Sequence, residues 1–144
     1  MNQVEYEQVL EEMLIPASKI LTWAKVIQQE YYQQYKQANR NLFDRILESA
    51  YKLVEQLPIY QKLGGEFERV QAITHGVAGP IIVIRDYTIL ILADPDWNAE
   101  AKQSEEERDN MLYLKKINSA AEYLASLDRD AALRMMLDEI DHEE

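Results

Sequence analysis

Apolar residues near the N-terminus recur in alternating steps of four and three, the spacing of a helix that packs along one seam of a left-handed bundle. The positions are Tyr6, Leu10, Met13, Ala17, Ile20, Ala24, Ile27 and Tyr31. The pattern predicts one nearly unbroken helix, on the order of 50 Å long at about 1.5 Å per residue, which suits an elongated bundle. Pro16 lies inside it and removes one backbone hydrogen bond, so we expect a kink there.

A second helix with a wide apolar face is predicted after a polar turn from Gln33 to Asn41. The residues of this face are Leu42, Phe43, Ile46, Leu47, Ser49, Ala50, Leu53, Val54 and Leu57. Pro58 is expected to bend or end the helix. Gly64-Gly65 is the only pair of adjacent glycines in the sequence, and it predicts a break between two halves of the chain.

The third segment repeats the three-four stepping. Its seam consists of Phe67, Val70, Thr74, Val77, Ile81, Ile84, Thr88 and Ile91. By propensity alone, Ile81-Ile82-Val83-Ile84 and Thr88-Ile89-Leu90-Ile91-Leu92 would pass as buried strands. The seam spacing and the similarity to the first half favour a helix.

A turn and a capping signal precede the last helix. Asp94-Pro95-Asp96 ends the third segment, and Ser104 followed by Glu105-Glu106-Glu107 predicts an N-cap with an acidic first turn. The predicted apolar face is Tyr113, Ile117, Ala120, Leu124, Leu127, Ala131 and Met135. We therefore predict an all-α, antiparallel four-helix bundle in one domain, 1–144, built from tandem helical hairpins at 1–63 and 66–140.

The two predicted hairpins match each other in sequence. At one constant offset, Pro16, Ile20, Trp23 and Ile27 match Pro80, Ile84, Tyr87 and Ile91. At a second offset, Leu47, Ser49, Ala50 and Leu57 match Ile117, Ser119, Ala120 and Leu127. The second offset is larger by six residues, so the second hairpin has the longer turn, and the pattern indicates a duplication.

Composition and charge exclude several classes of function. The chain has 144 residues, 47% of them hydrophobic, and no cysteine, which rules out a disulfide framework and a cysteine nucleophile. A net charge of −11 and the acidic end from Asp138 to Glu144 argue against a nucleic-acid surface.

The acidic N-terminal region lacks the features of a signal peptide, so we expect a cytoplasmic protein. Arg85 and Asp86 interrupt the apolar stretch from Val77 to Leu92, so we expect no membrane insertion.

A family resemblance rests on Ile73-Thr74-His75, on Pro80 five positions after the histidine with an Ile-x-x-Tyr pattern behind it, and on Ser119-Ala120 in the returning helix. Each half resembles one hairpin of the dimerisation and histidine-phosphotransfer (DHp) domain of sensor histidine kinases. In that family two hairpins from two chains form a four-helix bundle, and the histidine accepts a phosphoryl group. The resemblance implies that one chain imitates the dimer, acting as a monomeric pseudo-dimer or as a homodimer.

Departures from the family pattern narrow the expected activity. Gly76 stands where the family usually has an acidic residue, Gly79 replaces a polar residue that assists dephosphorylation, and Glu11 takes the place of the histidine in the first half. The sequence contains no glycine-rich phosphate loop. Too few residues follow Ser119-Ala120 to form an ATP-binding domain, so we expect none. The chain is therefore expected to be at most a histidine-containing phosphotransfer protein, without a kinase activity of its own.

His75 is the candidate phospho-acceptor, because a neutral imidazole nitrogen is a nucleophile at cytoplasmic pH. If the seam faces the core, His75, Gly79, Ile82 and Asp86 share an adjacent strip, and Ile82 and Val83 offer an apolar patch to a partner. The resemblance implies that this partner is a response-regulator receiver domain or a histidine kinase. The alternative is a non-catalytic helical adaptor or assembly protein in which His75 is incidental. No metal site and no cofactor are expected.

Overall fold

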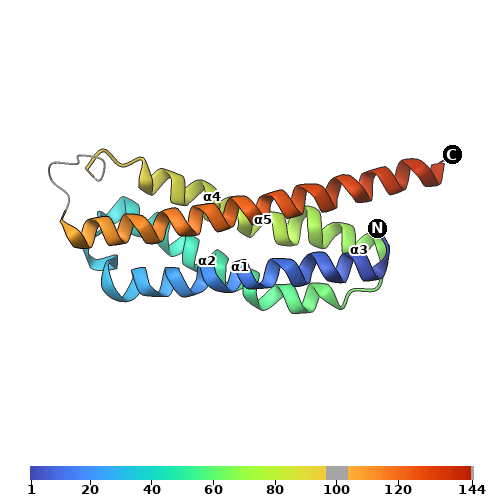
Figure 1. Ribbon diagram of the computed structural model, residues 1–144, viewed down its shortest axis with the longest axis horizontal. Helices are drawn as coiled ribbons and strands as arrows, with labels where there is room; N and C mark the ends of the chain where they lie inside the picture. Colours follow the sequence, from blue (N-terminus) through green and yellow to red (C-terminus); the bar gives the residue numbers. More distant parts are fainter. Residues whose placement is uncertain (97–103, 144) are drawn as a thin grey trace.

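The computed structural model describes residues 1–96 and 104–143, and in this part of the chain four long helical segments run side by side along one axis (Figure 1). Three of them are α1 (Gln3–Glu30), α2 (Gln37–Gln61) and α5 (Glu105–Glu143). The remaining segment, 66–92, consists of α3 (Glu66–Gln71), a π-helical turn η2 (Ala72–Val77) and α4 (Ala78–Leu92). A short 3-10 turn, η1 (Tyr32–Gln34), connects α1 to α2. No strand occurs in the described ranges, so the predicted all-α bundle is confirmed.

The chain reverses direction at each connection, so neighbouring helices are antiparallel (Figure 1). α1 packs against α2 and α5, and α4 packs against the same two helices. Each helix therefore has two principal neighbours, as in a square four-helix bundle. The hairpins α1–α2 and α4–α5 meet along two lines, one between α1 and α5 and the other between α2 and α4.

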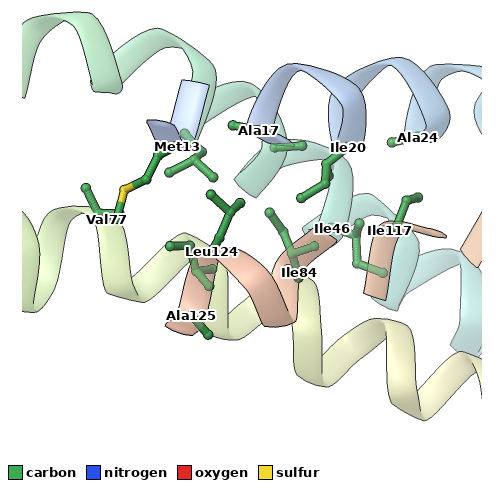
Figure 2. Packing of buried hydrophobic residues seen from close by; sticks show 14 of the residues in the cluster. Met13, Ala17, Ile20, Ala24, Ile46, Val77, Ile84, Ile117, Leu124 and Ala125 are labelled. Carbon is green, nitrogen blue, oxygen red and sulfur yellow. The ribbon is translucent and has the colours of Figure 1, made fainter. Parts of the chain in front are cut away.

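The core of α1 follows the predicted seam. Every seam position from Tyr6 to Ile27 is buried, and Tyr31, directly after the helix, is also buried. Figure 2 shows Met13, Ile20, Ile84 and Leu124 pointing toward one another between the helices. Apolar burial of this kind is the main stabilising contribution in a bundle without disulfides or metal.

The helix boundaries confirm the capping prediction and correct the turn prediction. Ser104 and Glu107 form a reciprocal capping box at the start of α5, with hydrogen bonds of 3.0 Å and 3.2 Å. α2 begins at Gln37, inside the stretch expected to be a turn, so the first connection is shorter than predicted. Pro58 lies within α2, which continues to Gln61.

The third helical segment is helical as predicted, but its seam is wrong upstream of Val77. Thr74 and Phe67 are exposed, and Ile73 is buried instead. The reason is η2, because a π-helical turn contains about one residue more than an α-helical turn and shifts the preceding residues around the axis. The bundle face therefore passes from Val77 to Ile73 rather than to Thr74.

The buried face of α5 is likewise rotated slightly from the prediction. Ile117, Leu124 and Ala131 are buried as expected, whereas Tyr113, Ala120 and Leu127 lie at the edge of the core. The additional buried positions are Asn110, Leu114, Ala121, Ala125 and Asp128.

One helix in the described ranges, Glu66–Leu92, is long and apolar enough to cross a membrane by length and composition. Core helices of soluble bundles meet the same criteria. Here one face of the helix packs against α2 and α5.

Candidate functional site

His75 lies in the π-helical turn η2, with its side chain exposed. Thr74 Oγ1 donates its only proton to the Val70 carbonyl oxygen at 2.8 Å, and the same oxygen lies 2.8 Å from His75 Nδ1. When the hydroxyl donates to Val70, Thr74 Oγ1 accepts from His75, and a neutral ring in this arrangement carries its proton on Nδ1. This tautomer leaves the lone pair on Nε2, so Nε2 is the nucleophilic atom.

A groove of about 290 Å³ lies beside His75, between α2 and α4. We call it the histidine groove. The side of η2 and α4 contributes His75, Gly79, Pro80, Val83 and Tyr87, and the side of α2 contributes Arg45, Glu48, Ser49 and Lys52. The α2 residues are spaced by three and four positions, which places them on one face of the helix.

The charges of the histidine groove favour an anion. Arg45 and Lys52 bring two cations to its wall, and Glu48 brings one carboxylate. This local excess of positive charge contrasts with a chain whose net charge is −11. Guanidinium and ammonium groups are the usual protein partners of phosphoryl oxygens.

The structure brings together only some of the residues expected to form the partner site. Gly79 and Val83 line the histidine groove with His75, but Ile82 and Asp86 are not among its lining residues. Ile82 is exposed. Asp86 accepts a hydrogen bond of 3.0 Å from Nε of Arg85, next to it in sequence.

Sequence reasoning missed the α2 wall of this groove, above all Arg45 and Lys52. The one available signal was Ser49, which the internal repeat pairs with Ser119. The cations one turn to either side of Ser49 share its face of α2.

The Tyr60 ring lies close to the backbone of Gly76, the residue after His75. A Cβ atom at Gly76 would lie 2.7 Å from both Cζ and Oη of Tyr60, so any side chain there must displace the ring. Tyr60 is held in turn by its carbonyl oxygen, which accepts a hydrogen bond of 2.6 Å from the Tyr6 hydroxyl. A Cβ atom at Gly79, by contrast, would meet no atom within 4 Å. A side chain directly after His75 would therefore have to displace the Tyr60 ring, whereas a side chain at Gly79 would have open space.

A second groove, of about 730 Å³, lies along the other line of contact between the hairpins, between α1 and α5. We call it the lysine groove. Its lining residues are Glu12, Ile15, Pro16, Lys19, Trp23, Leu112, Lys115, Lys116, Ser119, Ala120 and Tyr123. Pro16, Trp23 and Ser119 occupy this groove as their repeat partners Pro80, Tyr87 and Ser49 occupy the histidine groove. Among the described residues, no histidine lines the lysine groove.

No group of three metal-binding side chains occurs among the residues that the structure describes. A scan with protein-family models gave no match to the chain. A search of the curated proteins and a search of the solved structures also gave no match.

Proposed function

We propose that this protein is a phosphotransfer protein of the two-component type, and that His75 exchanges a phosphoryl group with an aspartate on a receiver-domain partner in the cytoplasm. The observation that carries the proposal is the exposed His75, with its Nδ1 atom 2.8 Å from Thr74 Oγ1, beside a groove lined by Arg45 and Lys52. A nucleophile with an oriented ring and nearby cations meets the needs of phosphoryl transfer.

The proposed step conserves atoms and charge. The Nε2 lone pair forms a P–N bond as the P–O bond of the aspartyl phosphate breaks, and the aspartate carboxylate leaves with the bonding electrons. The ring keeps its Nδ1 proton, and the hydrogen bond to Thr74 Oγ1 stabilises the resulting imidazolium. Arg45 and Lys52 offset the charge on the phosphoryl oxygens. A hydroxyl is a weaker partner for imidazolium than a carboxylate, so we expect slower transfer than with an acidic residue.

The two grooves support a tandem pseudo-dimer as the scaffold. Residues matched by the sequence repeat line equivalent places on the two lines of contact between the hairpins. Under the proposal, the second hairpin keeps the acceptor and the first hairpin supplies the other half of the bundle. A receiver would approach the histidine groove over Gly79 and Val83, with Ile82 and Asp86 at the rim.

The first test uses potassium phosphoramidate, which transfers phosphoryl groups to imidazole nitrogens without a protein partner. We expect one acid-labile phosphate per chain, located on His75 Nε2 by nitrogen-15 NMR. His75→Gln should remove it, and Thr74→Val should slow its formation. The chain has one other histidine, His142. Phosphate on His142 alone, or no phosphate at all, would contradict the proposal.

The second test uses a panel of phosphorylated receiver domains. Arg45→Gln with Lys52→Gln should slow transfer on the order of tenfold or more, since charge-assisted contacts contribute about 1.5–3 kcal/mol. The matched control is Lys62→Gln, because Lys62 is an exposed lysine that does not line the histidine groove. This substitution should leave the transfer rate unchanged.

A non-catalytic adaptor is the second candidate, and the packing of Tyr60 against Gly76 favours it, because this contact excludes an acidic neighbour of His75. An adaptor would bind receivers equally well with His75→Gln and transfer nothing. Binding measured by calorimetry alongside phosphate transfer separates the two functions.

A further inference from the structure

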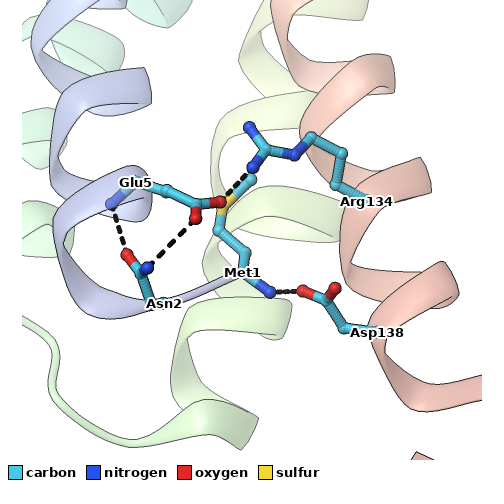
Figure 3. A network of polar contacts seen from close by, with 5 residues as sticks. All are labelled: Met1, Asn2, Glu5, Arg134 and Asp138. Atoms are coloured by element: carbon cyan, nitrogen blue, oxygen red, sulfur yellow. Dashed lines mark hydrogen bonds and ion pairs between the residues drawn. The ribbon is translucent and has the colours of Figure 1, made fainter. Parts of the chain in front are cut away.

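Helix α5 is longer than the helices it packs against. It has 39 residues, compared with 28 in α1. Figure 1 shows its C-terminal end extending past the N-terminus and α3. Near this end of α5, Arg134 forms an ion pair with Glu5 of α1, and Asp138 forms one with the amino group of Met1 (Figure 3).

The end of α5 presents an apolar stripe that the chain itself leaves uncovered. Leu133, Leu137 and Ile140 follow i, i+4, i+7 spacing, which places them on one face of the helix. Each of the three is between 50% and 53% exposed. Five acidic residues lie within or after the stripe in the sequence, namely Asp138, Glu139, Asp141, Glu143 and Glu144. We call residues 133–140 the α5 tail, an amphipathic helix that carries the carboxylates of Asp138 and Glu139 and the guanidinium of Arg134.

The lysine groove carries apolar and positively charged side chains, which complement the apolar stripe and the carboxylates of the α5 tail. Ile15, Leu112 and Tyr123 are exposed apolar residues on its walls. Lys19, Lys115 and Lys116 line the same groove, and Lys116 Nζ lies 6.0 Å from the centre of the Trp23 ring. An apolar floor with ammonium groups suits an amphipathic helix that carries carboxylates.

We propose that the lysine groove receives the α5 tail of a second copy of this chain, with the two α5 helices antiparallel. The arrangement is reciprocal, so it closes as a two-fold dimer with two equivalent contacts. The charges choose the direction, because Lys115 and Lys116 lie toward Leu112, whereas Glu12, the carboxylate in the lining, lies on antiparallel α1 toward the Tyr123 end. An antiparallel tail places Ile140 and the exposed Glu139 near Leu112 and the lysines.

The occupant must come from another molecule. Leu112 and Ile140 lie on the same helix, about 40 Å apart at about 1.5 Å per residue, so a tail cannot fold back into its own groove. The contact also leaves the histidine groove open, because that groove lies between α2 and α4. The dimer is therefore independent of phosphotransfer.

Light scattering after size-exclusion chromatography tests the dimer across a concentration series. We expect a mass of twice the 16.9 kDa of one chain, with the dimer weakening in high salt because exposed ion pairs are screened. Leu137→Gln with Ile140→Gln should give a monomer, and so should Lys115→Glu with Lys116→Glu. Circular dichroism checks that these exposed substitutions leave the helices intact.

Two control substitutions outside the proposed contact show whether any loss of the dimer is specific to the groove and the tail. Leu90→Gln alters an equally exposed apolar residue on α4, and Lys62→Glu reverses a lysine away from the groove, so both should remain dimeric. His75→Gln should also remain dimeric. A monomeric wild type, or controls that dissociate as readily as the groove variants, would overturn the proposal. The proposal would also be overturned if the groove variants were monomeric and the tail variants stayed dimeric, because another segment would then fill the groove.

The absence of native cysteine allows a direct geometric test. Leu112→Cys with Ile140→Cys should form a disulfide-linked dimer under mild oxidation. Leu90→Cys with Ile140→Cys should not form it, because Leu90 lies on α4. Equal cross-linking in the two variants would refute the proposed contact. Preferential cross-linking of Ile140→Cys to Tyr123→Cys would refute the antiparallel direction.

Discussion

Asp128→Asn is expected to stabilise the protein at neutral and alkaline pH. Asp128 keeps only 8% of its accessible surface, and its Oδ1 atom has no hydrogen-bond partner among the described residues. Burial raises the pKa of this carboxyl from 3.8 to about 7, and the charge of Arg129 only partly opposes the shift. The folded protein therefore binds the proton more tightly than the unfolded chain does.

The sign of the pH dependence follows from this difference. Between about pH 3.8 and pH 7 the folded state holds more protons at Asp128, so rising pH lowers the free energy of unfolding. At 1.36 kcal/mol per pKa unit, ionised Asp128 costs up to about 4 kcal/mol above pH 7. Water that reaches the carboxylate reduces this cost, so about 2–4 kcal/mol is expected. Asparagine has nearly the same shape and does not ionise, which removes the cost.

Urea unfolding followed by circular dichroism measures the effect. At about pH 8 we expect Asp128→Asn to be more stable than wild type by about 2–4 kcal/mol, with the difference shrinking toward about pH 4. Asp130→Asn, which replaces an exposed carboxyl two residues away, is the control and should show no such trend. A constant difference at both pH values would refute the reasoning, because it would mean that Asp128 does not titrate in this range in the folded state.

Four further substitutions test packing, a buried hydrogen bond and capping. Gly79→Ala should raise the free energy of unfolding by about 0.5–1 kcal/mol because open space surrounds this helical position, whereas Gly76→Ala should lower it by about 1–3 kcal/mol because a tyrosine ring must move; paired urea titrations compare them. Asn110→Ala removes the acceptor of a buried 2.8 Å hydrogen bond from the Tyr35 hydroxyl and should cost about 1–3 kcal/mol in the same assay. Ser104→Ala breaks the capping box of α5 and should cost about 1 kcal/mol, seen as a lower thermal midpoint; an unchanged midpoint would mean that the cap contributes nothing.

Sequence periodicity predicted the helices best where the backbone is regular. The α1 seam follows one unbroken α-helical repeat, so spacing alone identified each buried residue from Tyr6 to Ile27. The same method misplaced Thr74, because η2 changes the number of residues per turn within a continuous helix. The packing of Tyr60 against the backbone at Gly76, which lies in this turn, joins residues of two helices. Local spacing does not reveal such a contact.

The candidate site was partly predictable for a related reason. His75, Gly79 and Val83 lie on one helical segment, and short-range spacing could place them together. The opposite wall, with Arg45 and Lys52, depends on how α2 is oriented against α4. The helical repeat also predicted that Ile82 and Asp86 lie on one strip with His75. They are on the same helical segment as His75, but they do not line the histidine groove.

Both grooves are formed by one polypeptide, and this has an evolutionary consequence. In a four-helix bundle assembled from two identical hairpins on separate chains, every mutation appears in both hairpins, so the two grooves between the hairpins must remain identical. Here a codon change at Trp23 leaves Tyr87 untouched, and the position of Glu11 can change without altering His75. Each groove can therefore be selected separately, and one molecule can keep a polar surface on one side and an apolar surface on the other.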